Sequence, residues 1–296
     1  MHVHLLGVRG STSAPGSAFA RYGGHTSCVA VGHDGEVPSL VLDAGTGLRR
    51  IGELLHGAPF RGTVLLTHLH WDHTHGLPFA RPLDHAGADV HLLLPVPSDP
   101  PSGSGPTGER IARDVLAGVM GPPHFPITPD GLRGRWSFGT IEPSTFAVDG
   151  FTVTAAEVPH KGGRTYGYRV SDGTSTLAYL PDHGPSMLGP GPDGLGERHS
   201  AARALAHGVD VLLHDAQHTA AELPAVAGFG HSAAEYAVDL GRVAGARSVV
   251  LFHHDPDRTD DQLDAIGRTW TDEVAPTVVV AHEDLVLVLP ETFCPE

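Results

Sequence analysis

The stretch Thr67-His68-Leu69-His70-Trp71-Asp72-His73 follows the apolar run Thr63-Val64-Leu65-Leu66. A short run of this kind predicts a buried strand, and the loop after it carries three imidazoles and one carboxylate. Such donors suit Zn²⁺, and all four would crowd a single tetrahedral ion. The stretch therefore predicts a metal site, with two ions favoured over one. A chance cluster is the alternative, because the chain has 22 histidines, but an Asp among them directly after a strand argues against chance.

The composition is that of an acidic globular protein. Of its 296 residues, 40% are hydrophobic and 18% charged, and the formal net charge is −15. Such a charge repels polyanions, so long nucleic acid is a disfavoured partner. The chain lacks the long apolar run that a membrane span needs, and its two cysteines, Cys28 and Cys294, are too few for a disulfide framework. We therefore expect a cytoplasmic protein without membrane contact.

A histidine or aspartate recurs where predicted strands end. Asp182 follows a strand over 176–180, Asp215 one over 209–213 and His253 one over 248–252, while His160 lies between strands over 151–154 and 166–170. Neighbouring strands bring their ends together, so we expect these side chains to converge with the loop at 68–73. A single domain over 1–296 follows, because a division between 73 and 253 would split the set.

The segment 98–140 interrupts this pattern. It starts with a stretch rich in Pro, Gly and Ser, continues with helical spacing over 109–120, and then has prolines at 122, 123 and 126 that disrupt regular structure. We expect an excursion from the main fold that lies over or beside the metal site and limits access to it, because such loops are typically functional. Further on, Ser232 with Glu235 and Thr259 with Gln262 each predict a capping box that starts a helix, and the second helix is expected to run to about residue 274.

In this order the motifs resemble the metallo-β-lactamase superfamily, and more closely its RNase Z and cyclic-phosphodiesterase branch. The resemblance covers nearly the whole chain and rests on Arg9-Gly10-Ser11, residues 23–28, Asp43-Ala44-Gly45, the loop at 68–73, His160, Asp182, His214-Asp215-Ala216, Gly230-His231-Ser232 and Phe252-His253-His254. It implies an α/β fold, a four-layer αβ/βα sandwich with two mixed sheets and helices outside.

The resemblance also implies the cofactors and their ligands. Two divalent ions are expected, Zn²⁺ first, with Mn²⁺ or Fe as alternatives. The implied ligands are His68, His70 and His160 for one ion, Asp72, His73 and His253 for the other, and Asp182 as the bridge. Two such ions lower the pKa of a shared water and supply hydroxide as the nucleophile at neutral pH. We therefore expect a metal-dependent hydrolase.

His231 distinguishes between branches of the superfamily. In the RNase Z branch a His-Ser pair before a helix supplies a histidine over the metals, held by the acid of a His-acid-Ala motif, which here is Asp215. The resemblance implies that His231 stabilises transition-state charge or protonates the leaving oxygen; a capping-region histidine without a role is the alternative. The acid is Asp where RNase Z itself has Glu, which shortens its reach. The candidate catalytic residues are His231, Asp215 and Asp72.

Other charged residues near the motifs have two interpretations each. Asp43, at a strand end, either holds the metal loop through hydrogen bonds or is a turn residue. Lys161 and Arg164, beside His160, either meet an anionic substrate or are ordinary solvated loop charges.

The leading function is hydrolysis of a small or cyclic phosphodiester, so the expected partner is a small anionic substrate. Hydrolysis of a thioester, lactone or β-lactam by the same fold is the first alternative. RNase Z-type RNA processing is a weaker one, because the four arginines of 98–140 are balanced by acidic residues and form no basic arm for tRNA. A homodimer stays open.

Overall fold

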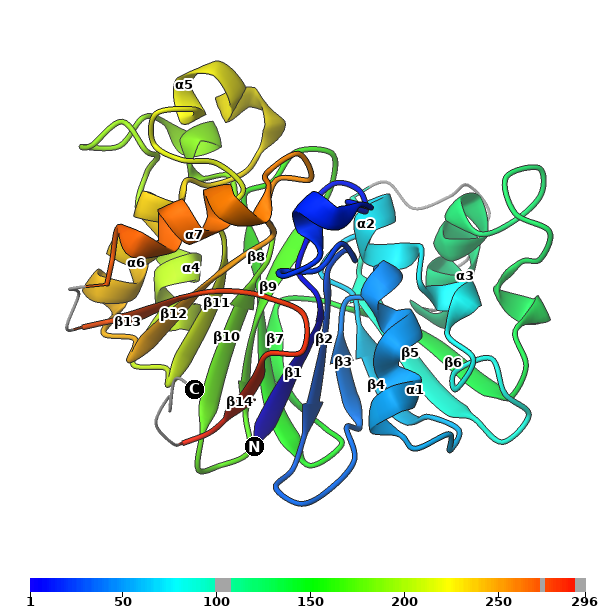
Figure 1. Ribbon diagram of the computed structural model, residues 1–296. Helices are drawn as coiled ribbons and strands as arrows, with labels where there is room; N and C mark the ends of the chain where they lie inside the picture. The colour runs from blue at the N-terminus through cyan, green and yellow to red at the C-terminus, as the bar shows by residue number, and fades with distance from the viewer. Residues whose placement is uncertain (99–107, 272–274, 291–296) are drawn as a thin grey trace.

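The computed structural model describes residues 1–98, 108–271 and 275–290. Figure 1 shows two facing sheets with helices on their outer sides. The first sheet has the order β14 (Val286–Val288), β1 (His2–Gly7), β2 (Cys28–Gly32), β3 (Leu40–Leu42), β4 (Arg61–Leu65), β5 (Asp89–Pro95), β6 (Arg135–Ile141). The second has the order β13 (Thr277–Val280), β12 (Ser248–Phe252), β11 (Val211–Asp215), β10 (Thr176–Leu180), β9 (Thr165–Ser171), β8 (Phe151–Val158), β7 (Ser144–Val148).

The helices are short. The α-helices are α1 (Ile51–Leu54), α2 (Trp71–Thr74), α3 (Gly108–Val119), α4 (Ser200–Ala206), α5 (Leu223–Val226), α6 (Ala234–Ala244) and α7 (Asp260–Arg268). The 3₁₀ helices are η1 (Ser17–Phe19), η2 (Thr46–Arg50), η3 (Leu77–Phe79), η4 (Pro129–Gly131), η5 (Pro185–Leu188) and η6 (Ala227–Phe229). Among the residues described, no helix is long and apolar enough to cross a membrane.

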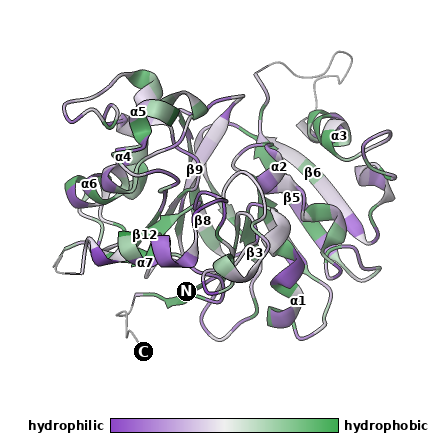
Figure 2. Cartoon of the chain, turned by 45° about the horizontal axis from the view of Figure 1, so that its top comes forward, coloured by the Kyte–Doolittle hydropathy of each residue, from purple (hydrophilic) through white to green (hydrophobic). Residues whose placement is uncertain are grey.

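Three apolar clusters hold the layers together. The central one lies between the sheets and joins residues from both ends of the chain, such as Leu5 and Leu287. A second packs α1 and α3 on the first sheet, and a third packs α4 and α6 on the second. Figure 2 shows α3 outside β6 and, across the molecule, α4 and α6 outside the second sheet. The four-layer αβ/βα sandwich that the motifs predict is confirmed.

The direction of the strands explains why site residues gather at one edge. Strands β3 to β6 are parallel, as are β10 to β13. β8 runs the same way as β10, because both pair antiparallel with β9. The carboxyl ends of these strands therefore lie at one edge of each sheet, where ligands bind in open α/β sheets.

Three expectations about local structure are corrected. The segment 98–140 does not leave the fold throughout, because Arg135–Ile141 is β6 and pairs with β5. Residues 99–107 lie outside the described residues. The predicted capping box is wrong: α6 begins after Ala233 without a side-chain cap, because the Ser232 hydroxyl donates to the His183 carbonyl instead. α7 has its expected capping box at Thr259, but ends at Arg268 rather than near 274.

The chain has two cysteines, Cys28 and Cys294. Cys28 is a free thiol buried in β2. Cys294 lies outside the described residues.

Candidate metal centre and its surroundings

The candidate metal centre starts where β4 ends. The chain leaves β4 at Leu65 and enters the short helix α2 at Trp71, with His70 as the extended residue before it. Asp72 and His73 therefore lie in the first turn of α2, and both side chains are buried.

The structure brings together all seven residues that the resemblance implies as ligands. In each of two groups, one nitrogen or oxygen per residue lies within 4.8 Å of the others. The first group is His68, His70, His160 and Asp182, and the second is Asp72, His73 and His253. β4, β8, β10 and β12 contribute the loops that carry them, so both sheets are needed for the cluster.

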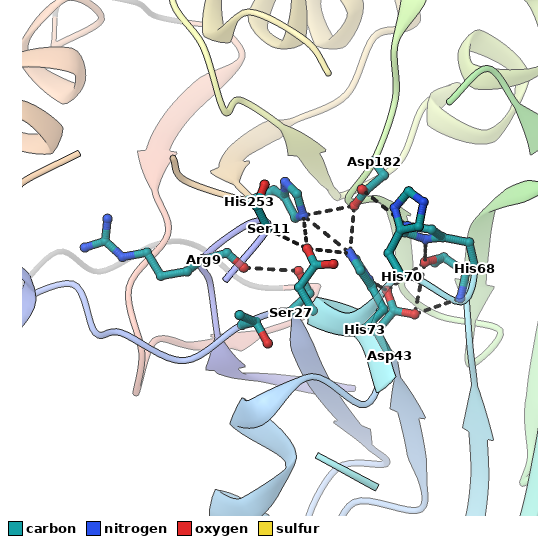
Figure 3. Close-up of polar contacts among 12 residues, drawn as sticks. Arg9, Ser11, Ser27, Asp43, His68, His70, His73, Asp182 and His253 are labelled. Atoms are coloured by element: carbon teal, nitrogen blue, oxygen red, sulfur yellow. Dashed lines mark hydrogen bonds and ion pairs between the residues drawn. The ribbon is translucent and has the colours of Figure 1, made fainter. Parts of the chain in front are cut away.

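The carboxylate of Asp182 lies between the two groups. Its Oδ2 is 3.5 Å from Nε2 of His68 and 3.3 Å from Nε2 of His160. Its Oδ1 is 3.0 Å from Nε2 of His73 and 3.1 Å from Nε2 of His253. Each oxygen therefore faces a different group, and Figure 3 shows Asp182 above His73 and beside His253.

Two of the histidines are oriented by acceptors on their far side. Nδ1 of His73 donates to the Asp43 carboxylate at 2.8 Å, and Nδ1 of His160 donates to the Gly230 carbonyl at 2.6 Å. These bonds place the proton on Nδ1 and leave the Nε2 lone pair directed into the cluster. Such orientation is typical of metal-binding histidines.

The charges fit divalent cations. Asp43, Asp72, Asp182 and Asp215 are all buried, and in the described part of the chain their only ion-pair partners are histidines. A buried charge is costly without a partner. Nε2 of His68 and Oδ1 of Asp182 are also buried without a hydrogen bond among the residues described. A metal ion at each group would satisfy both atoms and compensate the carboxylates.

The pKa of His73 shows the same negative field. Burial would lower this pKa, but the carboxylates of Asp182, Asp72 and Asp43 raise it well above the usual value of an imidazole. A field that favours a proton at this nitrogen also favours a metal cation there, and the two compete for the same lone pair.

His231 lies beside both groups and is held by Asp215. Nδ1 of His231 donates to Oδ2 of Asp215 at 2.9 Å, so the shorter acid does reach the imidazole. Asp215 also accepts the His183 amide N–H at 3.1 Å. Burial would lower the pKa of His231, but the adjacent Asp215 carboxylate raises it to about 9. Without bound metal, His231 is therefore a proton donor at neutral pH.

His231 is also close enough to be considered as a ligand. Together with Asp182 and His253 it forms a third group whose atoms lie within 4.8 Å of one another. Its Nδ1, however, is 4.0 Å from Asp182 and bonded to Asp215.

Asp43 holds the metal loop, as the first of its two interpretations states. Its carboxylate accepts the Thr67 amide N–H at 2.7 Å and the His73 ring N–H. The Tyr179 hydroxyl, from the other sheet, donates to it at 3.0 Å. Sequence reasoning missed Tyr179, because a tyrosine within an apolar strand gives no signal beyond burial.

Backbone contacts around the site were also missed. The Ser11 amide donates to Oδ2 of Asp72 at 2.7 Å. Ser11, Asp43 and His253 have positive φ angles of 62°, 60° and 60°. This conformation is unfavourable for residues other than glycine and concentrates at functional sites. The only signal for Ser11 was its place in the Arg9-Gly10-Ser11 motif, to which no role was assigned.

The two charged residues beside His160 have partners within the chain. Arg164 is paired with Glu142 and Glu157. The Lys161 ammonium lies 5.9 Å from the centre of the Phe229 ring. The four histidines that adjoin ligands, His75, His183, His214 and His254, belong to none of the three groups.

Two hollows adjoin the centre and share Trp71. The smaller, about 360 Å³, lies over the cluster and is lined by His70, Asp72, Asp182 and His231 among others. The larger, about 940 Å³, is also lined by Trp71 and includes residues 118–120, 124 and 125. The described part of 98–140 therefore reaches the neighbourhood of the metal loop.

Comparison with known proteins agrees with this geometry. The chain is 26% identical to ribonuclease Z of Salinibacter ruber over 270 residues, which cover 77% of this chain and 79% of that protein. The metallo-β-lactamase fold protein YhfI of Bacillus subtilis has a TM-score of 0.67 at 17% identity, with 97% and 98% of the two chains covered. A diphosphatase of the PhnP family also has a TM-score of 0.67, at 19% identity, with 97% of each chain covered. The family described as the β-lactamase superfamily domain matches residues 39–254. The chain therefore belongs to the metallo-β-lactamase superfamily, whose members are metal-dependent hydrolases.

Proposed function

We propose that this chain is a phosphodiesterase that acts on a small phosphodiester with two divalent cations, Zn²⁺ foremost. The observation that carries the proposal is the buried pair of His231 and Asp215, joined at 2.9 Å, in the hollow lined by His70, Asp72 and Asp182. A phosphodiester needs charge compensation on its phosphoryl oxygens and a proton for its leaving oxygen. The ligand cluster offers sites for the cations that would compensate this charge. We assign the donation of the proton to His231.

The seven ligand candidates form two sets, one for each cation. We infer that His68, His70 and His160 hold one and Asp72, His73 and His253 the other, with one Asp182 oxygen toward each. When bound, two such cations lower the pKa of a shared water and neutralise charge on the substrate.

Other groups of the protein orient the ligand candidates and donate a proton to the leaving oxygen. Asp43 and the Gly230 carbonyl keep the Nε2 atoms of His73 and His160 directed inward. The Ser11 amide fixes one oxygen of Asp72. His231 donates its proton to the leaving oxygen, and Asp215 keeps the ring in the orientation that allows this.

The test combines metal analysis with substrate comparison. Purified protein loaded with Zn²⁺ is assayed on bis-p-nitrophenyl phosphate, cyclic nucleotides and a thioester, and the metal content is measured on the same samples. We expect two ions per chain and turnover of phosphodiesters. One ion per chain at saturation, or turnover of the thioester alone, would reject the proposal in its metal or its substrate part.

RNA processing is the second candidate, because the relative from Salinibacter ruber is named ribonuclease Z. The arginines of the described part of 98–140 speak against it, since each is paired with an acidic residue: Arg110, Arg113, Arg133 and Arg135. They leave no surplus positive charge for tRNA phosphates. Cleavage of a tRNA precursor at rates comparable with small diesters would favour this candidate instead.

A further inference from the structure

The larger cavity beside Trp71 has the size of a ligand site. Its volume is about 940 Å³, at the upper end of the range for small-molecule pockets. The metal-loop helix α2 and the following η3 form one wall, and the end of α3 with residues up to 125 forms the other. Trp71 also lines the hollow over the candidate metal centre, so the two hollows are neighbours.

Exposed aromatic rings line this cavity. Trp71 is 67% exposed and Phe79 57% exposed. The Trp71 ring stacks on His75 with centroids 5.5 Å apart and planes 17° apart, and Phe79 meets Phe125 edge-on at 5.7 Å. Rings held in fixed orientation but open to solvent provide surfaces on which a planar aromatic group can stack.

The charge of the cavity is opposite to that of the chain. Among the described residues, the cavity lining contains no acidic residue but includes Arg49 and Arg81, in a chain with a net charge of −15. Both side chains are exposed, and neither forms an ion pair with any residue of 1–98, 108–271 or 275–290. A guanidinium without a carboxylate partner is suited to bind a phosphate.

We propose that this cavity binds a nucleotide unit of the substrate, with the base on the aromatic rings and a non-scissile phosphate at Arg49 and Arg81. The scissile phosphodiester then lies past Trp71, at the metal cluster. This inference rests on the proposed phosphodiesterase function and adds the substrate class: a nucleotide diester that carries a second phosphate.

Three substrates of increasing size test it. Methyl p-nitrophenyl phosphate has no base, thymidine 5′-(p-nitrophenyl phosphate) adds one, and its 3′-phosphorylated form adds the second phosphate. We expect kcat/KM of the Zn²⁺-loaded protein to rise along this series. Phe125→Ala should remove the gain from the base, and Arg49→Gln and Arg81→Gln the gain from the 3′-phosphate. Each loss should be roughly tenfold and appear in KM.

The controls separate this inference from the function on which it rests. Arg203→Gln, at an exposed arginine of α4 outside the cavity, should behave as the unaltered protein on all three substrates. Equal effects of the cavity variants on all three substrates, or no effect, would overturn the inference while the phosphodiesterase function stands. If no diester is hydrolysed, the phosphodiesterase function fails. Calorimetric binding of thymidine 3′,5′-bisphosphate then tests whether the cavity binds a nucleotide. Binding weakened by Phe125→Ala and Arg81→Gln supports it, and no binding overturns it.

Discussion

At the level of single residues, the candidate centre depends on side chains that each make two contacts through different atoms. Asp182 directs one oxygen to each ligand group. His73 binds Asp43 through Nδ1 and faces the cluster through Nε2. His231 binds Asp215 through Nδ1 and borders the hollow over the candidate metal centre. Substitutions at the outward contacts should therefore affect the cluster without removing a ligand.

Substitution of His231 should separate proton donation from metal binding. We expect His231→Ala to keep both metals and to lower turnover of phosphodiesters by roughly 10²–10⁴-fold, the usual size of an acid–base contribution. The loss should be smaller on p-nitrophenyl esters than on alkyl esters, because a phenolate leaves without a proton. Asp215→Asn should cause a smaller loss of the same kind. Equal losses on both ester types would indicate charge stabilisation alone, and loss of a metal would make His231 a ligand.

Asp43 should control metal affinity from outside the ligand set. All its partners donate to it, so Asp43→Asn places an amide N–H against at least one other donor. We expect Zn²⁺ to bind about 10- to 100-fold more weakly, the range for residues that orient ligands. Competition with a chelator measures the affinity. Asp34→Asn, at an exposed turn, is the matched control, and equal affinities in both variants would contradict the role of Asp43.

At the level of elements, close backbone approach lets the N-terminal turn and the β12 loop meet at the centre. The turn after β1 carries Gly10, and a Cβ there would lie 2.3 Å from Nδ1 of His253. The Ser11 amide, one residue on, donates to Asp72. The same turn therefore contacts two residues of the second ligand group.

Gly10→Ala should weaken that second group selectively. The added methyl must displace the His253 ring, because no real Cβ tolerates so short a contact. We expect metal content to fall from two ions toward one per chain after gel filtration, with the fold intact by circular dichroism. Gly118→Ala in α3, where a Cβ meets no described residue within 4 Å, should keep both ions. Two tightly held ions in the Gly10 variant would show that the loop can move without cost.

The segment 98–140 contributes to the core as well as to the cavity wall. Leu116 of α3 and Phe138 of β6 are buried in the cluster that covers the first sheet. Removal of the whole segment would therefore expose core residues and an inner strand. Its effect on substrate preference is better probed by single substitutions at 118–125 than by deletion.

At the level of the whole molecule, buried neutral histidines link folding to pH. His183, His214 and His254 are buried, and burial lowers the pKa of each below that of a free imidazole. For His254, burial, to which the Arg9 guanidinium adds, lowers it to about 3. A histidine with a lowered folded pKa contributes stability above its unfolded pKa, about 6.5, that is lost as the pH falls. His73 and His231, with raised pKa values, act in the opposite sense, and their contribution is lost as the pH rises.

The metal-free protein should therefore lose stability between pH 6.5 and 5. Urea unfolding of EDTA-treated protein measures this, with metal removed so that ligand release does not contribute. We expect His254→Gln to reduce the slope by up to about 1.4 kcal/mol per pH unit, because one proton fewer is taken up on unfolding. An unchanged slope would mean that His254 already binds a proton in the folded state.

The sequence by itself determined the features that depend on neighbours along the chain. The loop at 68–73 places four donors within six residues after a strand. The family resemblance supplied the other ligand candidates, from the ends of other strands. Most strands and the capping box at Thr259 could be predicted in the same way, because local patterns and short spacings carry them. The αβ/βα sandwich followed from the family resemblance.

Only the tertiary structure decided the contacts that depend on register and on the packing of one sheet against the other. Asp215 contacts His231, 16 positions along the chain, and Tyr179 contacts Asp43, 136 positions away. The two oxygens of Asp182, at the end of a strand of the second sheet, face His68 and His73, which follow a strand of the first. The strand β6 was not predicted from the sequence. Its pairing with β5, a contact between distant segments, stabilises it as a strand. Ser232 does not cap α6, because its hydroxyl donates a hydrogen bond to the His183 carbonyl instead. The physical reason is the same in each case: the core sets which strand ends meet, and no spacing along the chain records it.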